Sequence, residues 1–243
     1  MAFDIKKPIS KASRFEALRA AAVAAISPVE NSDSTAISKE KRLVSPSDCS
    51  ERIRVVFDDS GSMGGASIRE AKEGCVEFLR NCIPGQTAVA IHLMNPKDQR
   101  YLDPLIMNAE LSSDLIKIAS SIAAIEAPGG TPLFPTILRA LRATPCATRL
   151  IAFSDGSPDT QEEKERAISL ANKLKIPIDT VFIDGGYSNS AASALMKEIA
   201  DRTGGYFLDL QRGSSFKNAF KYLAPINRLR LSDGNFRASL EGR

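Results

Sequence analysis

The sequence predicts an α/β fold, a doubly wound and mostly parallel six-stranded sheet with helices on both faces. Short apolar runs rich in β-branched residues, typical of buried strands, alternate with segments whose apolar residues recur every three or four positions, typical of one helix face. Such alternation favours parallel strands, because each helix returns the chain to the same end of the sheet. With 243 residues, 43% of them hydrophobic, the chain is long enough to bury a sizeable core.

The expected elements begin just after residue 50. Strands are predicted at residues 52–58, 87–94, 99–106, 149–155, 176–184 and 206–210. Helices are predicted where apolar residues share a face, at residues 68–82, 115–125, 137–141, 167–174, 195–199 and 216–223. Ser112 or Ser113 is the expected N-cap of the second helix, and Gly204 is the expected end of the fifth.

Three segments are expected along the chain. Residues 1–50 combine an N-terminal helix, with Phe15 and Ile26 on its apolar face, and a Ser-rich polar linker. Residues 51–224 form the α/β domain. Residues 225–243 form a short basic C-terminal tail.

Composition excludes several classes of protein. A net charge of +3 spread over mixed signs is too weak for a dedicated nucleic-acid binder. No apolar run approaches the 18 residues of a membrane span, so we expect no membrane partner. The four cysteines form no C-x-x-C pair and the one histidine is His92, so a zinc site is not expected. Unpaired cysteines indicate a reducing, cytoplasmic setting.

Short polar side chains stand beside glycine in three loops of the predicted fold. Asp58, Ser60 and Ser62 follow the first strand, Thr131 lies in a Gly-Gly-Thr-Pro loop, and Asp155 follows the strand at 149–155. Open parallel sheets carry their sites at the carboxyl ends of strands, so we expect these five side chains to converge.

Two carboxylates and three hydroxyls are hard oxygen donors, which favour Mg²⁺, with Mn²⁺ and Ca²⁺ sharing the same preference. The three hydroxyls can bind the ion directly while the carboxylates of Asp58 and Asp155 hold coordinated waters. An ion held in this way keeps an open position that an outside carboxylate can fill. The pattern therefore predicts a metal site at which an acidic residue docks.

These five residues resemble the complete metal-ion-dependent adhesion site of von Willebrand factor A domains, in the right order and over residues 51–224. The resemblance is to the intracellular prokaryotic or phage type. It implies an antiparallel edge strand, here residues 99–106, and a non-enzymatic adaptor that grips a Glu or Asp of a partner protein through the metal. For the intracellular members it also implies work beside AAA+ ATPases of the MoxR type or in stress-response systems.

Two other functions stay open at this point. The same site could serve a metal-dependent hydrolase or phosphoryl-transfer enzyme, whose base would be Asp58, Asp155 or Asp184. The chain could also be a structural subunit of a phage or secretion assembly. Of the remaining polar residues, Asp59 is expected to be solvated or to support the ligands from behind, and His92 to be a satisfied core histidine.

Overall fold

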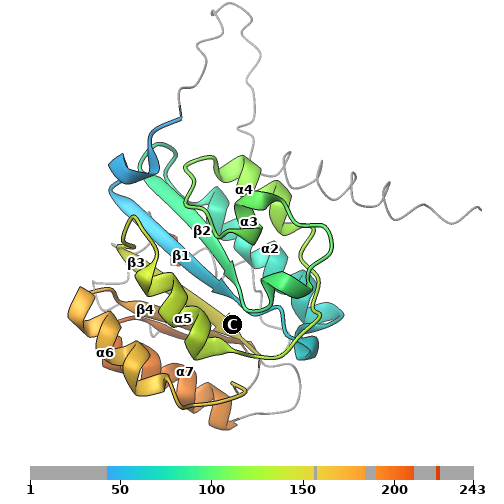
Figure 1. Cartoon of the computed structure of the whole chain (residues 1–243), viewed down its shortest axis with the longest axis vertical. Coiled ribbons are helices and arrows are strands. Elements are labelled where there is room, and N and C mark those ends of the chain that lie inside the picture. Colours follow the sequence, from blue (N-terminus) through green and yellow to red (C-terminus); the bar gives the residue numbers. More distant parts are fainter. Residues whose placement is uncertain (1–42, 156–157, 184–189, 211–222, 225–243) are drawn as a thin grey trace, which may run out of the picture.

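A parallel sheet forms the centre of the computed structural model, which describes residues 43–155, 158–183, 190–210 and 223–224 (Figure 1). Its elements in chain order are η1 (Pro46–Asp48), β1 (Glu51–Phe57), η2 (Gly61–Met63), α2 (Ala66–Arg80), β2 (Thr87–Leu93), η3 (Pro96–Asp98), α3 (Pro104–Met107), α4 (Leu115–Ile122), α5 (Leu133–Arg142), β3 (Arg149–Ser154), α6 (Lys164–Leu174), β4 (Ile178–Ile183), α7 (Ser190–Thr203) and β5 (Phe207–Leu210).

The order of the strands across the sheet is β2-β1-β3-β4-β5, and every pair is parallel. After β1 the chain adds β2 on one side, and it later returns to add β3 on the other. The strand order therefore reverses at β1 and β3, whose carboxyl ends form the topological switch point where ligands bind in open α/β sheets.

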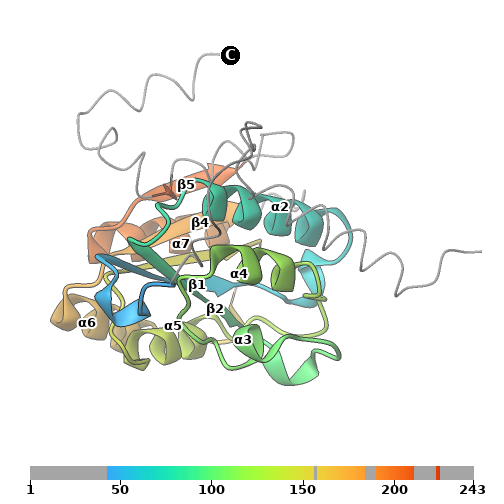
Figure 2. The same ribbon diagram turned by 90° about the horizontal axis from the view of Figure 1, so that it is seen from above.

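Helices cover both faces of this sheet, as predicted (Figure 1). Side chains alternate along each strand, so Val55 packs in the cluster that contains α2 and α4, whereas Val56 packs in the cluster that contains α5, α6 and α7. The short helix α3 packs against the edge strand β2 and against α4, on the side of the sheet away from β5 (Figure 2). Cys75 of α2 is buried in the first cluster, and burial raises the pKa of its thiol to about 12.

The predicted strand at residues 99–106 is wrong, and with it the six-stranded sheet and its antiparallel edge. The described residues form five strands, all parallel. Pro104 has no backbone N–H for a strand ladder and is suited to the first turn of a helix, where it begins α3. Asp103 caps that helix by accepting a hydrogen bond from the Leu105 N–H at 2.9 Å. The antiparallel contact with β2 in this region is a single bridge between Val89 and Ser112.

Of the two predicted helix ends, the N-cap of α4 is wrong and the end of α7 is confirmed. The N-cap of α4 is Asp114, whose Oδ1 accepts from the Lys117 N–H at 2.9 Å, while Ser112 only supports it by accepting from the Asp114 N–H. Helix α7 ends at Thr203, and Gly204 follows with φ of +70°, a left-handed conformation that favours glycine.

Several expectations lie outside the described residues. They are the N-terminal helix, most of the polar linker, the loop with Asp184, all but the end of the last helix, and the C-terminal tail. In the ranges that the structure covers, no helix combines the length and hydropathy needed to cross a bilayer.

Candidate metal centre

Four of the five predicted metal ligands form a hydrogen-bonded row at the carboxyl ends of β1 and β3. The hydroxyls of Ser60 and Ser62 lie 3.0 Å apart, and Ser62 Oγ donates to Asp155 Oδ1 at 2.8 Å. Asp58 is fully buried behind them; its Oδ1 accepts from the Ser60 N–H at 2.9 Å and its Oδ2 accepts from the Ser154 hydroxyl. Strand pairing brings these residues together, because Phe57, which precedes Asp58, is the register partner of Phe153, which precedes Ser154 and Asp155.

The loop that carries Thr131 lies against the same row. Ser60 forms a parallel bridge with Gly129, and the Gly61 N–H donates to Gly129 O at 2.7 Å. Thr131 itself is held through its backbone, since its N–H donates to Asp159 Oδ2 at 2.9 Å and its carbonyl accepts from the Asp159 N–H at 3.1 Å. Its side chain is buried, and none of the hydrogen bonds between described residues uses its hydroxyl.

Asp59 is fully buried, so the expectation of a solvated side chain is wrong and that of a supporting role is the one consistent with its contacts. Its Oδ1 accepts from the backbone N–H and the side-chain amide of Asn95, at 2.9 and 3.2 Å. Its Oδ2 accepts from Gln99 Nε2 at 2.7 Å. Asn95 reaches on to Gly130 O at 2.7 Å, and Gln99 bonds both the carbonyl and the N–H of Glu126 at 2.8 Å. Asp59 therefore anchors the segment that leads to Thr131.

Three residues of this support were missed in the sequence: Asn95, Gln99 and Asp159. Asn95 lies two residues beyond the end of β2, and its position just past a strand end was a usable signal. Gln99 and Asp159 lie in irregular segments with no such signal. Their closeness explains the glycine pair, because a Cβ on Gly129 would lie 2.4 Å from Asn95 Cγ and one on Gly130 would lie 2.7 Å from Asp159 Oδ2.

The two carboxyl groups of the row are electrostatically costly. Burial raises the pKa of Asp58 despite its hydrogen bonds from Ser154 and Ser60. Burial also raises the pKa of Asp155, and the nearby Asp58 carboxylate raises it further. Neither makes an ion pair with a described lysine or arginine. A cation bound between these two carboxylates would reduce both their mutual repulsion and the cost of burying their charges.

The spacing of the row fits a small divalent cation. Neighbouring ligands about 2.1 Å from an octahedral ion lie about 3.0 Å from one another. The hydroxyls of Ser60 and Ser62, the two members of the row expected to bind the ion directly, lie 3.0 Å apart. Ser62 is exposed, so the row opens to solvent. The donors include serine hydroxyls, and no group of three His, Cys, Asp or Glu side chains suited to a metal occurs here or elsewhere in the described ranges.

Comparison with solved structures defines the fold class: the chain has the fold of von Willebrand factor A domains. It resembles the von Willebrand factor domain of the type V pili tip protein Mfa5 from Porphyromonas gingivalis, with a TM-score of 0.52 and 14% identity over 72% of this chain and 95% of that one. An aerotolerance-related membrane protein from Bacteroides fragilis gives 0.53 and 16% identity, over 70% and 96% of the two chains.

A third neighbour carries a metal. Proximal thread matrix protein 1 from the mussel byssus, solved with zinc in its adhesion-site motif, has a TM-score of 0.52 and 20% identity over 75% of this chain and 46% of that one. At these identities the likeness concerns the fold alone. No protein-family model and no curated protein matches the sequence.

Proposed function

We propose that this chain is a non-enzymatic binding module that docks an acidic side chain of a partner protein onto a divalent cation held at the ends of β1 and β3. The observation that carries the proposal is the pair of Ser60 and Ser62 hydroxyls at ligand spacing, with the Asp155 carboxylate hydrogen-bonded to Ser62 and the buried Asp58 behind them. Ser60, Ser62 and Thr131 would hold the ion directly, and Asp58 and Asp155 would hold its waters and balance its charge.

The metal is proposed to be Mg²⁺, since hydroxyls and retained waters suit its octahedral preference, with Mn²⁺ and Ca²⁺ as competitors for the same oxygens. The zinc-loaded byssus protein supports a divalent ion in a site of this kind. When bound, the ion supplies a Lewis-acidic position open to a carboxylate from outside. The partner is proposed to present a Glu or Asp, and the resemblance points to a cytoplasmic setting and an AAA+ ATPase of the MoxR type.

The contacts of Asp58 favour this function over the hydrolase alternative. A general base must accept a proton from a substrate or water within hydrogen-bond reach. Asp58 is fully buried and both of its oxygens already accept hydrogen bonds from serines, so it is poorly placed for that task.

Calorimetric titration of Mg²⁺, Mn²⁺, Ca²⁺ and Zn²⁺ into the full chain tests the metal claim. The matched variants are Ser62→Ala, which removes an exposed ligand, and Ser67→Ala, which changes a serine of α2 whose side chain makes no hydrogen bond with the described residues. Wild type and Ser67→Ala should bind, and Ser62→Ala should bind about tenfold more weakly, for one lost oxygen contact. The metal claim fails if no ion binds or if both variants behave alike.

An immobilised-protein assay tests the partner claim separately. Wild type and Ser62→Ala are presented to cell extract with Mg²⁺ or with EDTA. A docking partner is retained by wild type with Mg²⁺ and is lost in the other three samples. Metal binding without any such protein would leave a metal site but remove the adaptor function.

A further inference from the structure

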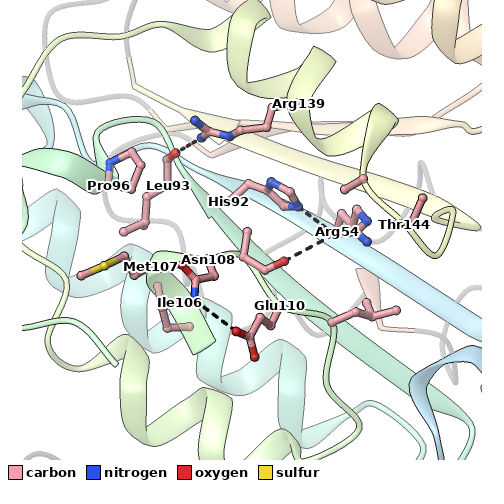
Figure 3. Close-up of a pocket in the computed structure, with 13 residues that line it drawn as sticks. Arg54, His92, Leu93, Pro96, Ile106, Met107, Asn108, Glu110, Arg139 and Thr144 are labelled. Atoms are coloured by element: carbon pink, nitrogen blue, oxygen red, sulfur yellow. Dashed lines mark hydrogen bonds between the residues drawn. The ribbon is translucent and has the colours of Figure 1, made fainter. Parts of the chain in front are cut away.

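A second polar site lies away from the candidate metal centre, on the α5 face of the sheet beside the edge strand β2. It is a pocket of about 300 Å³ between α5 and residues 106–111 (Figure 3). Arg54, His92 and Arg139 line it together with apolar side chains such as Leu93 and Ile106, and none of the five predicted metal ligands does.

Arg54 and His92 lie at the base of this pocket, buried at 1% and 2% exposure. The sheet register places them together: Val56 pairs with His92, and Arg54 points to the same face of β1 two residues earlier. Arg54 Nη1 lies 3.0 Å from His92 Nε2, and Nη2 donates to Pro145 O at 3.0 Å. Among the described residues no carboxylate pairs with this guanidinium.

The hydrogen bond between these two side chains fixes the tautomer of the histidine. A guanidinium can only donate, so Nε2 of His92 must accept, and the proton of the neutral ring is then on Nδ1. Burial and the charges of Arg54 and Arg139 lower the pKa of His92 to about 3, which keeps the ring neutral. Neither this Nδ1–H nor the Nε–H of Arg54 has a partner in the described structure. The expectation that His92 is satisfied is therefore wrong for one ring nitrogen.

Two buried donors without acceptors, beside an unpaired cation, are costly in a folded protein. Arg139 adds a second guanidinium at the exposed rim, where it donates to Leu93 O. Glu110 is the one carboxylate among the residues that line the pocket, and its oxygen accepts from the Asn108 amide at 3.2 Å. The pocket thus has an excess of positive charge and of hydrogen-bond donors, which is the complement of an oxyanion.

We propose that this pocket binds a small organic oxyanion, a carboxylate or phosphate group between Arg139 and Arg54, with the rest of the ligand against the apolar wall. Arg139 makes the first contact because it is exposed, and the charges of both arginines hold the anion. Arg54 and His92, whose Nε and Nδ1 groups have no partner among the described residues, line the same pocket. This pocket contains none of the proposed metal ligands, although the Asp59 carboxylate lies close enough to Arg139 to oppose the lowering of the Arg139 pKa by burial.

Titration with sodium phosphate and with sodium benzoate tests the proposal, on the full chain, at constant ionic strength and without added divalent metal. Omitting the metal prevents anions from binding at the metal centre. Because His92 is the one histidine of the chain, its ring nitrogens give a single set of nitrogen NMR signals. We expect at least one probe to bind with a dissociation constant below about 10 mM and to shift the Nδ1 signal. The probe that binds tells phosphate from carboxylate ligands.

Two arginines on the same helix supply the matched variants. Arg139→Gln removes the rim guanidinium and should weaken binding about tenfold, whereas Arg142→Gln, one turn later, exposed and outside the pocket, should leave it unchanged. Both substitutions are at exposed positions, so both variants should fold. The proposal is overturned if neither probe binds, if the two variants lose the same affinity, or if binding leaves the His92 signals in place.

Discussion

Gln99 Nε2 donates a hydrogen bond to Asp59 Oδ2 at 2.7 Å, joining the residue that follows the first ligand of the candidate metal centre to a segment 40 positions later in the chain. The same amide nitrogen donates to Glu126 O, and Gln99 Oε1 accepts from the Glu126 N–H, both at 2.8 Å. One side chain thus ties the end of β1 to the start of the loop that carries Thr131. The position of that loop therefore depends on a residue that is distant from Thr131 in the sequence but adjacent to the site in space.

Removal of this tie should be costly. Gln99→Ala is expected to lower the free energy of unfolding by about 2–3 kcal/mol, because it leaves the buried Asp59 Oδ2 and the Glu126 backbone groups without their partners. Urea denaturation measures this. Gln86→Ala, at an exposed position, should change stability by less than about 0.5 kcal/mol. Equal losses in the two variants would show that the tie contributes nothing.

Two glycines of the same site should differ in their tolerance of a methyl group. A Cβ on Gly129 would overlap Asn95, 2.4 Å from its Cγ, whereas a Cβ on Gly61 would meet Gly129 O at an ordinary 3.7 Å. Gly129→Ala should therefore destabilise the protein by about 1–3 kcal/mol, and Gly61→Ala by clearly less. Thermal unfolding of the two variants measures the difference. A Gly61→Ala protein that is less stable than Gly129→Ala would contradict the geometry.

Metal should stabilise the fold through Thr131. If Mg²⁺ binds the native state only, a concentration of 100 times its dissociation constant adds about 2.7 kcal/mol to the free energy of unfolding. Thr131→Val keeps the shape and removes a hydroxyl that no described hydrogen bond uses, so the metal-free stability should change little. A tenfold loss of affinity at the same Mg²⁺ concentration should remove about half of the Mg²⁺ increment. Denaturation with and without Mg²⁺ measures both quantities. An unchanged increment would remove Thr131 from the ligand set.

His92 should make stability depend on pH. Its pKa is lowered to about 3 in the folded state, by burial first and then by Arg54 and Arg139, against about 6.5 in the unfolded chain. Between these values the unfolded state binds the proton and the folded state does not, so stability falls as the pH falls. The slope from this one group is at most about 1.4 kcal/mol per pH unit.

The contribution is isolated by subtraction. Unfolding free energies of wild type and His92→Gln are compared from pH 7 to pH 4.5, where the carboxyl groups titrate in both proteins and cancel to first order. The wild-type free energy of unfolding minus that of His92→Gln should decrease as the pH falls. A difference that stays constant with pH would mean that the buried ring is protonated as readily as in the unfolded chain.

The strand and helix assignments were largely predictable, because burial imposes a periodicity of two or of three to four wherever an element is long. The strand predicted at 99–106 was wrong because a few apolar residues around Pro104 do not distinguish a strand from the start of a helix. Pro104 favours the helix, since it lacks the N–H that a strand ladder needs. The prediction of the α4 N-cap was wrong by one or two residues. Ser112, Ser113 and Asp114 are all residue types that cap helices well, and only the local backbone conformation selects Asp114.

Local pattern alone determined the α/β architecture, the faces of the helices and the placing of polar residues such as Asp58 and Asp155 directly after strands. Those features depend on neighbours a few positions apart. The tertiary structure alone decided that β1 lies between β2 and β3, that Ser60 pairs with Gly129, and that Arg54 meets His92. Such contacts join residues tens of positions apart, and strand order, which no local periodicity encodes, brings them together.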